Sequence, residues 1–269
     1  MVESGSSTSA VGAGPEQGAQ GRPLILLSND DGVHAEGLHK LRLALREIAD
    51  VFVVAPASEQ SATSHRITLA EPLRHRDLGH DVHMVDGSPA DCIYVALNLG
   101  GLLPRRPNLV VSGINHGFNL GMDVIYSGTV AAAREGALRG IPALAISADP
   151  QADMSVAATH SVPLVQRLLE APRPEGAAPL LNVNFPAGSP RGVLATRLGK
   201  RDYEDRVEVR SDPRGRRYYW VGGPAVVHDG SEGADTTAVD LGYVSVTPLS
   251  LEMTQAAHAP LALWIAGQR

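Results

Sequence analysis

Short apolar runs alternate with amphipathic segments through the first two thirds of the chain. The runs are typical of buried strands in a parallel sheet. They cover residues 24–28, 51–55, 81–85, 109–112, 141–147 and 180–185. Apolar side chains at helical spacing between them predict helices, which cover residues 38–50, 88–99, 127–139 and 156–170. Strands alternating with helices predict βαβ units and an α/β fold with a doubly wound, mainly parallel sheet.

Three connecting segments have a different character. Residues 57–65 form a polar loop, residues 67–73 are expected to be extended, and residues 113–121 form a loop punctuated by glycines. Ligand-binding side chains are expected in the loops over residues 57–65 and 113–121, because loops at a sheet edge carry function more often than the strands do.

The pattern changes after about residue 190. Residues 206–211 and 216–221 flank the turn sequence Asp212-Pro213-Arg214-Gly215 and predict a β-hairpin. We therefore expect a main domain over residues 23–190 and a β-rich C-terminal arm over residues 191–269. Residues 1–22 are rich in Gly, Ser and Ala and lack the basic and apolar regions of a signal peptide, so a disordered tail or a start-site extension is expected there.

Composition narrows the class of protein. The 269 residues are 43% hydrophobic but only 4% aromatic, which indicates an aliphatic core. A net charge of −6 argues against nucleic-acid binding through bulk electrostatics. Cys92 is the single cysteine, which excludes a disulfide framework and a thiolate zinc cluster. No apolar run has the length of a membrane span, and we expect a cytoplasmic protein without a membrane partner.

Two adjacent carboxylates, Asp30 and Asp31, follow the first predicted strand and precede Gly32. At a strand end the alternation of side chains breaks, so both can converge on one point. Carboxylates held that close repel each other unless a proton or a cation lies between them. A hard divalent cation is the first hypothesis, and a solvated Asp-Asp-Gly turn is the alternative.

Further oxygen ligands follow other predicted strands. Ser61, Asn115 and the segment Ser127-Gly128-Thr129 all fall in loops that can meet Asp30 and Asp31 at one sheet edge. Such an all-oxygen set suits Mg²⁺, Mn²⁺ or Ca²⁺ better than zinc. The ten histidines show no zinc-binding spacing, although His65 and His116 fall in loops expected near this site.

The segment Ser127-Gly128-Thr129 also opens a predicted helix. Free backbone N–H groups, a small residue and two hydroxyls make an anion site there, with a plain N-cap as the alternative. A divalent cation beside such a site indicates phosphoryl chemistry. The chain has neither a P-loop nor a Gly-x-Gly-x-x-Gly motif, so an NTPase or a dinucleotide dehydrogenase is not indicated.

Several ordered motifs resemble those of the SurE family of stationary-phase survival proteins, which are metal-dependent nucleotide phosphatases. The matching segments cover residues 25–34, 53–56, 59–61, 87–92, 110–115, 119–121, 124–133 and 242–249. They span about residues 24–250, so the resemblance leaves out only the N-terminal tail and the extreme C-terminus.

The resemblance implies a Rossmann-like domain with a hairpin arm that builds homodimers or homotetramers. It implies one divalent ion per subunit, Mg²⁺ or Mn²⁺, and hydrolysis of nucleoside 5′-monophosphates, with 3′-monophosphates and polyphosphate as further substrates. Its metal ligands fall on Asp30, Asp31, Ser61 and Asn115, with the two aspartates as catalytic residues. Its phosphate-binding positions fall on Asn119, Ser127, Gly128 and Thr129.

Two other classes of protein are alternatives. A receiver-type signalling domain also holds Mg²⁺ on an acidic pair after its first strand, and Asp86 is the candidate phospho-acceptor. Such a domain has about half this length and a lysine after its last strand, where this chain has Ala148-Asp149. A non-catalytic, metal-dependent nucleotide-binding module is the other alternative.

Overall fold

The structure is a computed structural model that describes residues 21–172, 176–203, 207–221 and 226–268. Most of the expected N-terminal tail therefore lies outside the described residues. Arg22, which the sequence analysis placed in that tail, belongs to the folded body. Its guanidinium donates to the carbonyl oxygens of Arg46 and Ala49 and lies 3.5 Å from the Asp50 carboxylate.

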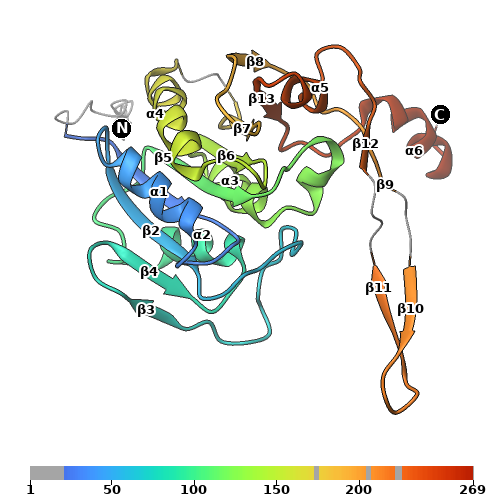
Figure 1. The fold of residues 1–269 in the computed structure, drawn as a ribbon, viewed down its shortest axis with the longest axis horizontal. Coiled ribbons are helices and arrows are strands. Elements are labelled where there is room, and N and C mark those ends of the chain that lie inside the picture. Colours follow the sequence, from blue (N-terminus) through green and yellow to red (C-terminus); the bar gives the residue numbers. More distant parts are fainter. Residues whose placement is uncertain (1–20, 173–175, 204–206, 222–225, 269) are drawn as a thin grey trace, which may run out of the picture.

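A nine-stranded sheet forms the centre of the molecule, with the strand order β3-β4-β2-β1-β5-β6-β7-β13-β8 (Figure 1). The strands are β1 (Leu24–Ser28), β2 (Asp50–Pro56), β3 (His75–Asp77), β4 (Val82–Val85), β5 (Leu109–His116), β6 (Ala143–Ala148), β7 (Leu180–Phe185), β8 (Val193–Ala195) and β13 (Val244–Leu249). Six neighbouring strands, from β4 to β7, are parallel. The mainly parallel α/β sheet predicted from the sequence is confirmed.

The six parallel strands have the Rossmann order. Numbered along the chain they run 3-2-1-4-5-6, and the order reverses between β1 and β5. In open α/β sheets this reversal leaves a crevice at the carboxyl ends of the two strands, because the connections that follow them lead to opposite sides. The end of β1 is where Asp30 and Asp31 follow.

Helices cover both faces of the sheet. They are α1 (Glu36–Leu45), α2 (Pro89–Asn98), α3 (Gly128–Leu138) and α4 (Met154–Glu170). Because strand side chains alternate, Ile25 and Leu27 pack in the core with α1 and α4, whereas Leu24 and Leu26 pack in the core with α2 and α3. This double burial explains why the strands read as continuous apolar runs.

Capping side chains fix three of the helix starts. Ser88 and Asp91 form a reciprocal capping box at α2, and Ser127 Oγ accepts the Val130 N–H at α3. Asp153 accepts the N–H groups of Ser155 and Val156, so α4 begins before the expected residue 156. Cys92 is buried in α2, as expected.

Other boundaries differ from the prediction. Helix α1 ends at Leu45 rather than near residue 50, and residues 67–73 pair with no strand, whereas β3 forms just after them. Strand β5 continues through residues 113–116, which were predicted as loop, because Asn115 and His116 pair with Ser147 and Ala148 of β6. Pairing partners in the fold therefore outweigh local glycine signals.

The segment after residue 190 adds to the main sheet as well as forming an arm. Strand β13 pairs antiparallel with β7 and parallel with β8, so the sheet crosses the expected domain boundary. Strands β9 (Arg201–Tyr203) and β12 (Val226–His228) pair with each other, and the helices α5 (Asp235–Asp240) and α6 (Ala259–Ile265), with the 3-10 turns η1 (Gly121–Ile125) and η2 (Ala256–His258), complete the described elements. Among the described helices, none has the length and apolar character to cross a bilayer.

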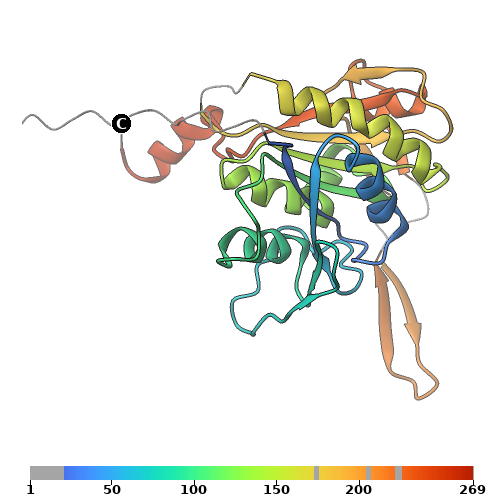
Figure 2. The same ribbon diagram turned by 90° about the vertical axis from the view of Figure 1, so that its left-hand side faces the viewer.

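The predicted hairpin is formed by β10 (Val207–Ser211) and β11 (Arg217–Val221), while Arg206 lies outside the described residues. Figures 1 and 2 show that it projects away from the body of the protein. Every residue of both strands is exposed. The Asp212 carboxylate closes the turn by accepting the N–H groups of Arg214 and Arg216.

Candidate active site

A cleft of about 600 Å³ opens at the switch point between β1 and β5. Its lining residues come from the end of β1, the loop after β2, the end of β5, the segment that enters α3, and β9. They are Asp30, Asp31, Glu59, Ser61, Ala62, Asn115, His116, Gly117, Phe118, Asn119, Asp123, Tyr126, Ser127 and Tyr203. The cleft thus brings together all four expected metal ligands and two of the expected phosphate-binding residues.

Asp30 is the buried acid of the cleft, with 5% of its surface exposed. Thr129 is fully buried beside it, and its hydroxyl donates to Asp30 Oδ1. Burial raises the pKa of Asp30 to about 6; the Thr129 hydrogen bond opposes that rise, and the neighbouring Asp31 adds to it. The carboxylate therefore carries a charge that the surrounding protein only partly stabilises.

Asp31 is more open to the cleft. Its Oδ2 accepts the His116 N–H at 3.2 Å, which links the end of β1 to the end of β5. Burial raises the pKa of Asp31, the His116 N–H opposes that rise, and the charge of Glu59 adds to it. A positive charge placed between Asp30 and Asp31 would therefore stabilise the ionised form of both carboxylates.

The loop after β2 supplies Ser61 together with an acid that the sequence analysis did not assign to the site. Ser61 Oγ donates to the Glu59 carboxylate at 2.7 Å, and both residues line the cleft. The Gln60 N–H donates to the Asp30 carbonyl at 2.8 Å, so this loop is held directly against the end of β1. The Glu-x-Ser spacing was the available signal for Glu59, since a hydroxyl two residues from a carboxylate can reach it.

Asn115 lies on β5 where the strand reaches the cleft. Its Nδ2 donates to the Gly117 carbonyl at 2.7 Å, which fixes the orientation of the amide. Because Nδ2 donates this hydrogen bond, Oδ1 is the side-chain atom that can serve as a metal ligand.

The four expected phosphate-binding residues fall into two pairs. Ser127 and Asn119 line the cleft, and the Asn119 amide is oriented by donating to Ser147 Oγ at 2.7 Å. Gly128 and Thr129 pack against Asp30 instead. A Cβ on Gly128 would lie 2.8 Å from the Asp30 Cβ, so only glycine allows α3 to approach this closely.

The donor set fits a hard divalent cation. Two carboxylates with raised pKa values, a hydroxyl and an amide oxygen line one cleft, and carboxylate, hydroxyl and carbonyl oxygens are the ligands that Mg²⁺ and Mn²⁺ prefer. Across the described residues, no three His, Cys, Asp or Glu side chains group together as a metal site.

The cleft is also lined by residues that the sequence did not indicate. Asp123 of η1 accepts hydrogen bonds from Arg201 and from the Tyr203 hydroxyl, both on β9. Burial raises the pKa of Tyr203 to about 12, and the hydrogen bond to Asp123 adds to that rise. Tyr126 and Phe118 are the other aromatic residues that line the cleft. No local motif pointed to Tyr203, because it comes from an element distant in sequence.

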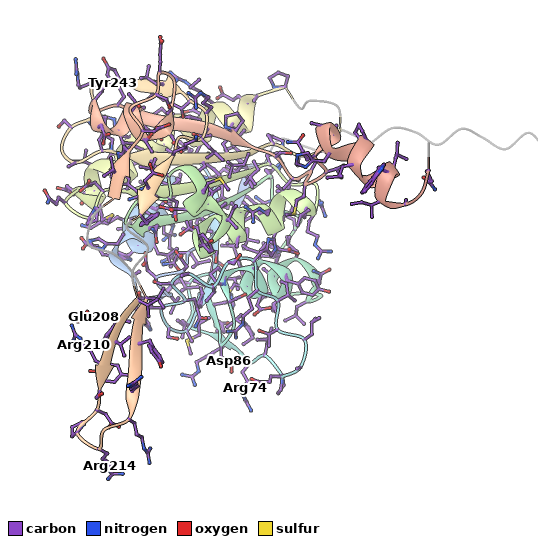
Figure 3. The ribbon with its side chains drawn as sticks, turned by 90° about the vertical axis from the view of Figure 1, so that its right-hand side faces the viewer. Arg74, Asp86, Glu208, Arg210, Arg214 and Tyr243 are labelled. Carbon is purple, nitrogen blue, oxygen red and sulfur yellow. The ribbon has the colours of Figure 1, made fainter. Side chains whose placement is uncertain are left out.

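Asp86, the phospho-acceptor required by the receiver alternative, lies outside the cleft. Its carboxylate accepts the Arg74 N–H and lies 3.6 Å from the Arg74 guanidinium. Figure 3 shows both residues at the exposed end of the β3–β4 region. A receiver-type site would need this acid beside Asp30 and Asp31, so the geometry does not support that alternative.

Comparisons with known proteins agree with this architecture. The model of the family described as "Survival protein SurE" matches residues 25–205. A Sorangium cellulosum protein named 5′-nucleotidase SurE is 56% identical over 92% of this chain and 97% of its own length. A Thermus thermophilus protein named 5′-nucleotidase SurE 1 is 47% identical over 86% of this chain and 92% of its own.

The fold agrees as well. The crystal structure of the SurE protein from Aquifex aeolicus superposes with a TM-score of 0.79 at 40% identity, covering 91% of this chain and all of the other. Identity of this extent along nearly the whole chain, on the same fold, leaves one assignment: the chain belongs to the SurE family.

Proposed function

We propose that this protein is a divalent-metal-dependent 5′-nucleotidase, a phosphoric monoester hydrolase that releases phosphate from nucleoside 5′-monophosphates. The observation that carries the proposal is the pair of acids Asp30 and Asp31, both with raised pKa values, in a cleft at the switch point of the sheet. Relatives with 45–56% identity carry the name 5′-nucleotidase SurE.

In this proposal Asp30, Asp31, Ser61 and Asn115 hold the cation. When bound, a divalent ion polarises the phosphoryl oxygens and lowers the pKa of a water molecule. Asp31 is the acid more open to the cleft, and burial raises its pKa above the usual value, which makes the carboxylate a stronger base. We assign it the role of accepting a proton from the attacking water. Ser127 and Asn119, which line the same cleft, bind the phosphate.

In this proposal the nucleoside stacks on aromatic residues of the cleft. Phe118, Tyr126 and Tyr203 line the cleft, and aromatic faces stack on any base. Stacking of this kind is tolerant of base identity, so we expect activity on several nucleoside monophosphates. Hydrolysis of 3′-monophosphates and of polyphosphate belongs to the same proposal. The residues assigned to the metal and the phosphate would contact the phosphoryl group and not the group attached to it.

The proposed assembly is a homodimer or homotetramer with one metal ion per subunit, in the cytoplasm. The exposed hairpin supports it, since a two-stranded hairpin has little stability of its own in water. The net charge of −6 supports a partner other than nucleic acid.

The test is phosphate release from a panel of 5′- and 3′-monophosphates and polyphosphate, with Mg²⁺ or Mn²⁺. We expect activity that EDTA removes and added metal restores, and that Asp30→Asn and Asp31→Asn each abolish. Binding of AMP without phosphate release would favour a non-catalytic nucleotide-binding module. An acyl phosphate trapped by hydroxylamine would replace the direct attack of water with an aspartyl-phosphate route.

A further inference from the structure

A partly buried hydrogen bond outside the cleft connects the loop that carries Ser61 to helix α3. His65 Nε2 lies 2.9 Å from Glu135 Oε2. Glu135 lies in the second half of α3 and is only 3% exposed. Its other oxygen, Oε1, accepts from Arg139 Nε at 2.9 Å. The carboxylate is thus shared between a helix residue and a loop residue.

The Glu135 carboxylate stays ionised because His65 and Arg139 donate hydrogen bonds to it. Burial alone would raise the pKa of Glu135, but the hydrogen bonds from His65 and Arg139 lower it below its usual range. Arg139 is itself held in place, because its guanidinium lies 4.9 Å from the centre of the Tyr94 ring on α2. Glu135 is therefore a fixed, charged acceptor, and hydrogen bonds to charged groups are stronger than those between neutral groups.

The loop between Ser61 and His65 has a backbone that requires external support. Ala62 and Ser64 have φ values of 55° and 53°, in the left-handed region that non-glycine residues rarely adopt. Such conformations persist where surrounding contacts fix them. Ser64 donates from its backbone N–H to the Tyr126 carbonyl at 2.9 Å and from its hydroxyl to the Ile125 carbonyl at 2.7 Å.

We propose that His65 is a positioning residue for the metal site. Through its hydrogen bond to Glu135 it fixes the turn over residues 61–64, and thereby holds Ser61 and Glu59 beside Asp30 and Asp31. Helix α3 then orients both sides of the site, since Thr129 in its first turn holds Asp30 and Glu135 holds the Ser61 loop. This inference rests on the proposed metal dependence and concerns metal affinity rather than the chemical step.

The test compares His65→Leu with His65→Gln. Leucine removes the hydrogen bond to Glu135, whereas the glutamine amide nitrogen can donate from about the same position as Nε2. We expect His65→Leu to bind Mn²⁺ about tenfold more weakly by calorimetry, and His65→Gln to restore most of the affinity. At saturating Mn²⁺ the kcat for AMP should return to within about twofold of wild type. Hydrogen exchange of the Ser64 amide should accelerate in the leucine variant.

Thr68→Val is the matched control. Its hydroxyl donates to the Asp91 carboxylate at 2.7 Å, further along the same segment, and the Thr68 N–H keeps its own bond to Asp91 after the substitution. We expect this variant to lose stability without changing Mn²⁺ affinity. Should His65→Leu fail to fold, His65→Asn, whose shorter amide does not reach Glu135, carries the same expectation.

Wild-type Mn²⁺ affinity and wild-type Ser64 exchange in the variant that lacks the hydrogen bond would overturn the inference. So would an equal loss of affinity in Thr68→Val, because it would indicate general destabilisation. A wild-type protein that binds Mn²⁺ but releases phosphate from no monophosphate would refute the proposed function instead, while the binding and exchange measurements would still decide the role of His65.

Discussion

The Thr129 hydroxyl donates a hydrogen bond to Asp30 across 99 residues of sequence. Both side chains are buried, so the bond acts in a low-dielectric environment, in which a hydrogen bond is electrostatically stronger than in water. The Thr129 hydroxyl therefore donates its proton to Asp30 and cannot donate it to a phosphate. A hydrogen bond from Thr129 to phosphate would have to come from its backbone N–H. This hydrogen bond lowers the pKa of Asp30 and so opposes the larger effect of burial, which raises it.

Thr129→Val is expected to shift the pH dependence of activity. The substitution is nearly isosteric but removes a hydrogen bond that opposes the raised pKa of Asp30. Loss of a hydrogen bond to a charged group costs about 1.5–3 kcal/mol, which corresponds to a rise of about one to two pKa units. At limiting Mn²⁺ the acid limb of the pH–rate profile should move upward. Thr129→Ser should retain the wild-type profile, and identical profiles for valine and wild type would contradict the expectation.

Asp30→Asn is expected to stabilise the metal-free protein at neutral pH although it abolishes activity. Burial raises the pKa of Asp30 from 3.8 to about 6, so the folded protein binds this proton more tightly than the unfolded chain does. Metal-free wild type should therefore lose stability as the pH rises from about 4 through about 6, by up to about 3 kcal/mol.

The asparagine variant lacks this titration. In EDTA its free energy of unfolding should exceed that of wild type at pH 8, and the difference should disappear near pH 4. Urea denaturation at both pH values measures it, with excess Mn²⁺ as the comparison, since metal binding should reverse the order of the two proteins. An equal difference at both pH values would show that the buried charge is not its cause.

Gly128→Ala is expected to damage the site with little effect on helix formation. The new Cβ would lie 2.8 Å from the Asp30 Cβ and 3.1 Å from Pro89 Cγ, so either Asp30 or the start of α3 must move. Alanine at Gly100 meets nothing within 4 Å and serves as the control. We expect a loss of Mn²⁺ affinity and activity in the first variant and wild-type behaviour in the second. Wild-type affinity in both would show that the close approach is not needed.

The sequence predicted the elements better than the contacts between them. Strand β1 could be found because it is buried on both faces, and α2 could be found because Ser88 and Pro89 mark its start. The extension of β5 could not be predicted from the sequence, because it depends on pairing with β6. Likewise, Tyr203 joins the cleft through a hydrogen bond to Asp123, and no spacing rule connects residues 80 positions apart.

Side-chain roles were harder to predict than side-chain positions. The residues Ser127, Gly128 and Thr129 indicated an anion site, and the helix start is where it was expected. Which atoms face the cleft depends on how closely α3 packs against Asp30, and this is a tertiary property. Composition and periodicity carry no information on it, because the same three residues would cap the helix equally well in either orientation.

The hairpin has one face that is expected to lie in a subunit interface. Val207 pairs with Val221 and Val209 pairs with Tyr219, so these four apolar side chains share one side of the two-stranded ribbon. Their exposed fractions run from 55% to 86%. The other side carries Tyr218 and Trp220, which are also exposed, beside Glu208 and Arg210, which form an ion pair at 2.9 Å (Figure 3). An apolar face this exposed favours burial against another subunit.

Tyr219→Glu is therefore expected to weaken the oligomer, whereas Arg210→Gln on the other face should not. The glutamate places a charge within the apolar face, and burying an unpaired charge in an interface costs several kcal/mol. Size-exclusion chromatography with light scattering at micromolar concentration should show a wild-type dimer or tetramer, a smaller species for Tyr219→Glu and the wild-type mass for Arg210→Gln. Mn²⁺ affinity should remain unchanged in both variants, because the hairpin contributes no residue to the lining of the cleft. A monomeric wild type would refute the interface, and an equal effect of both substitutions would show that the apolar face is not what the partner recognises.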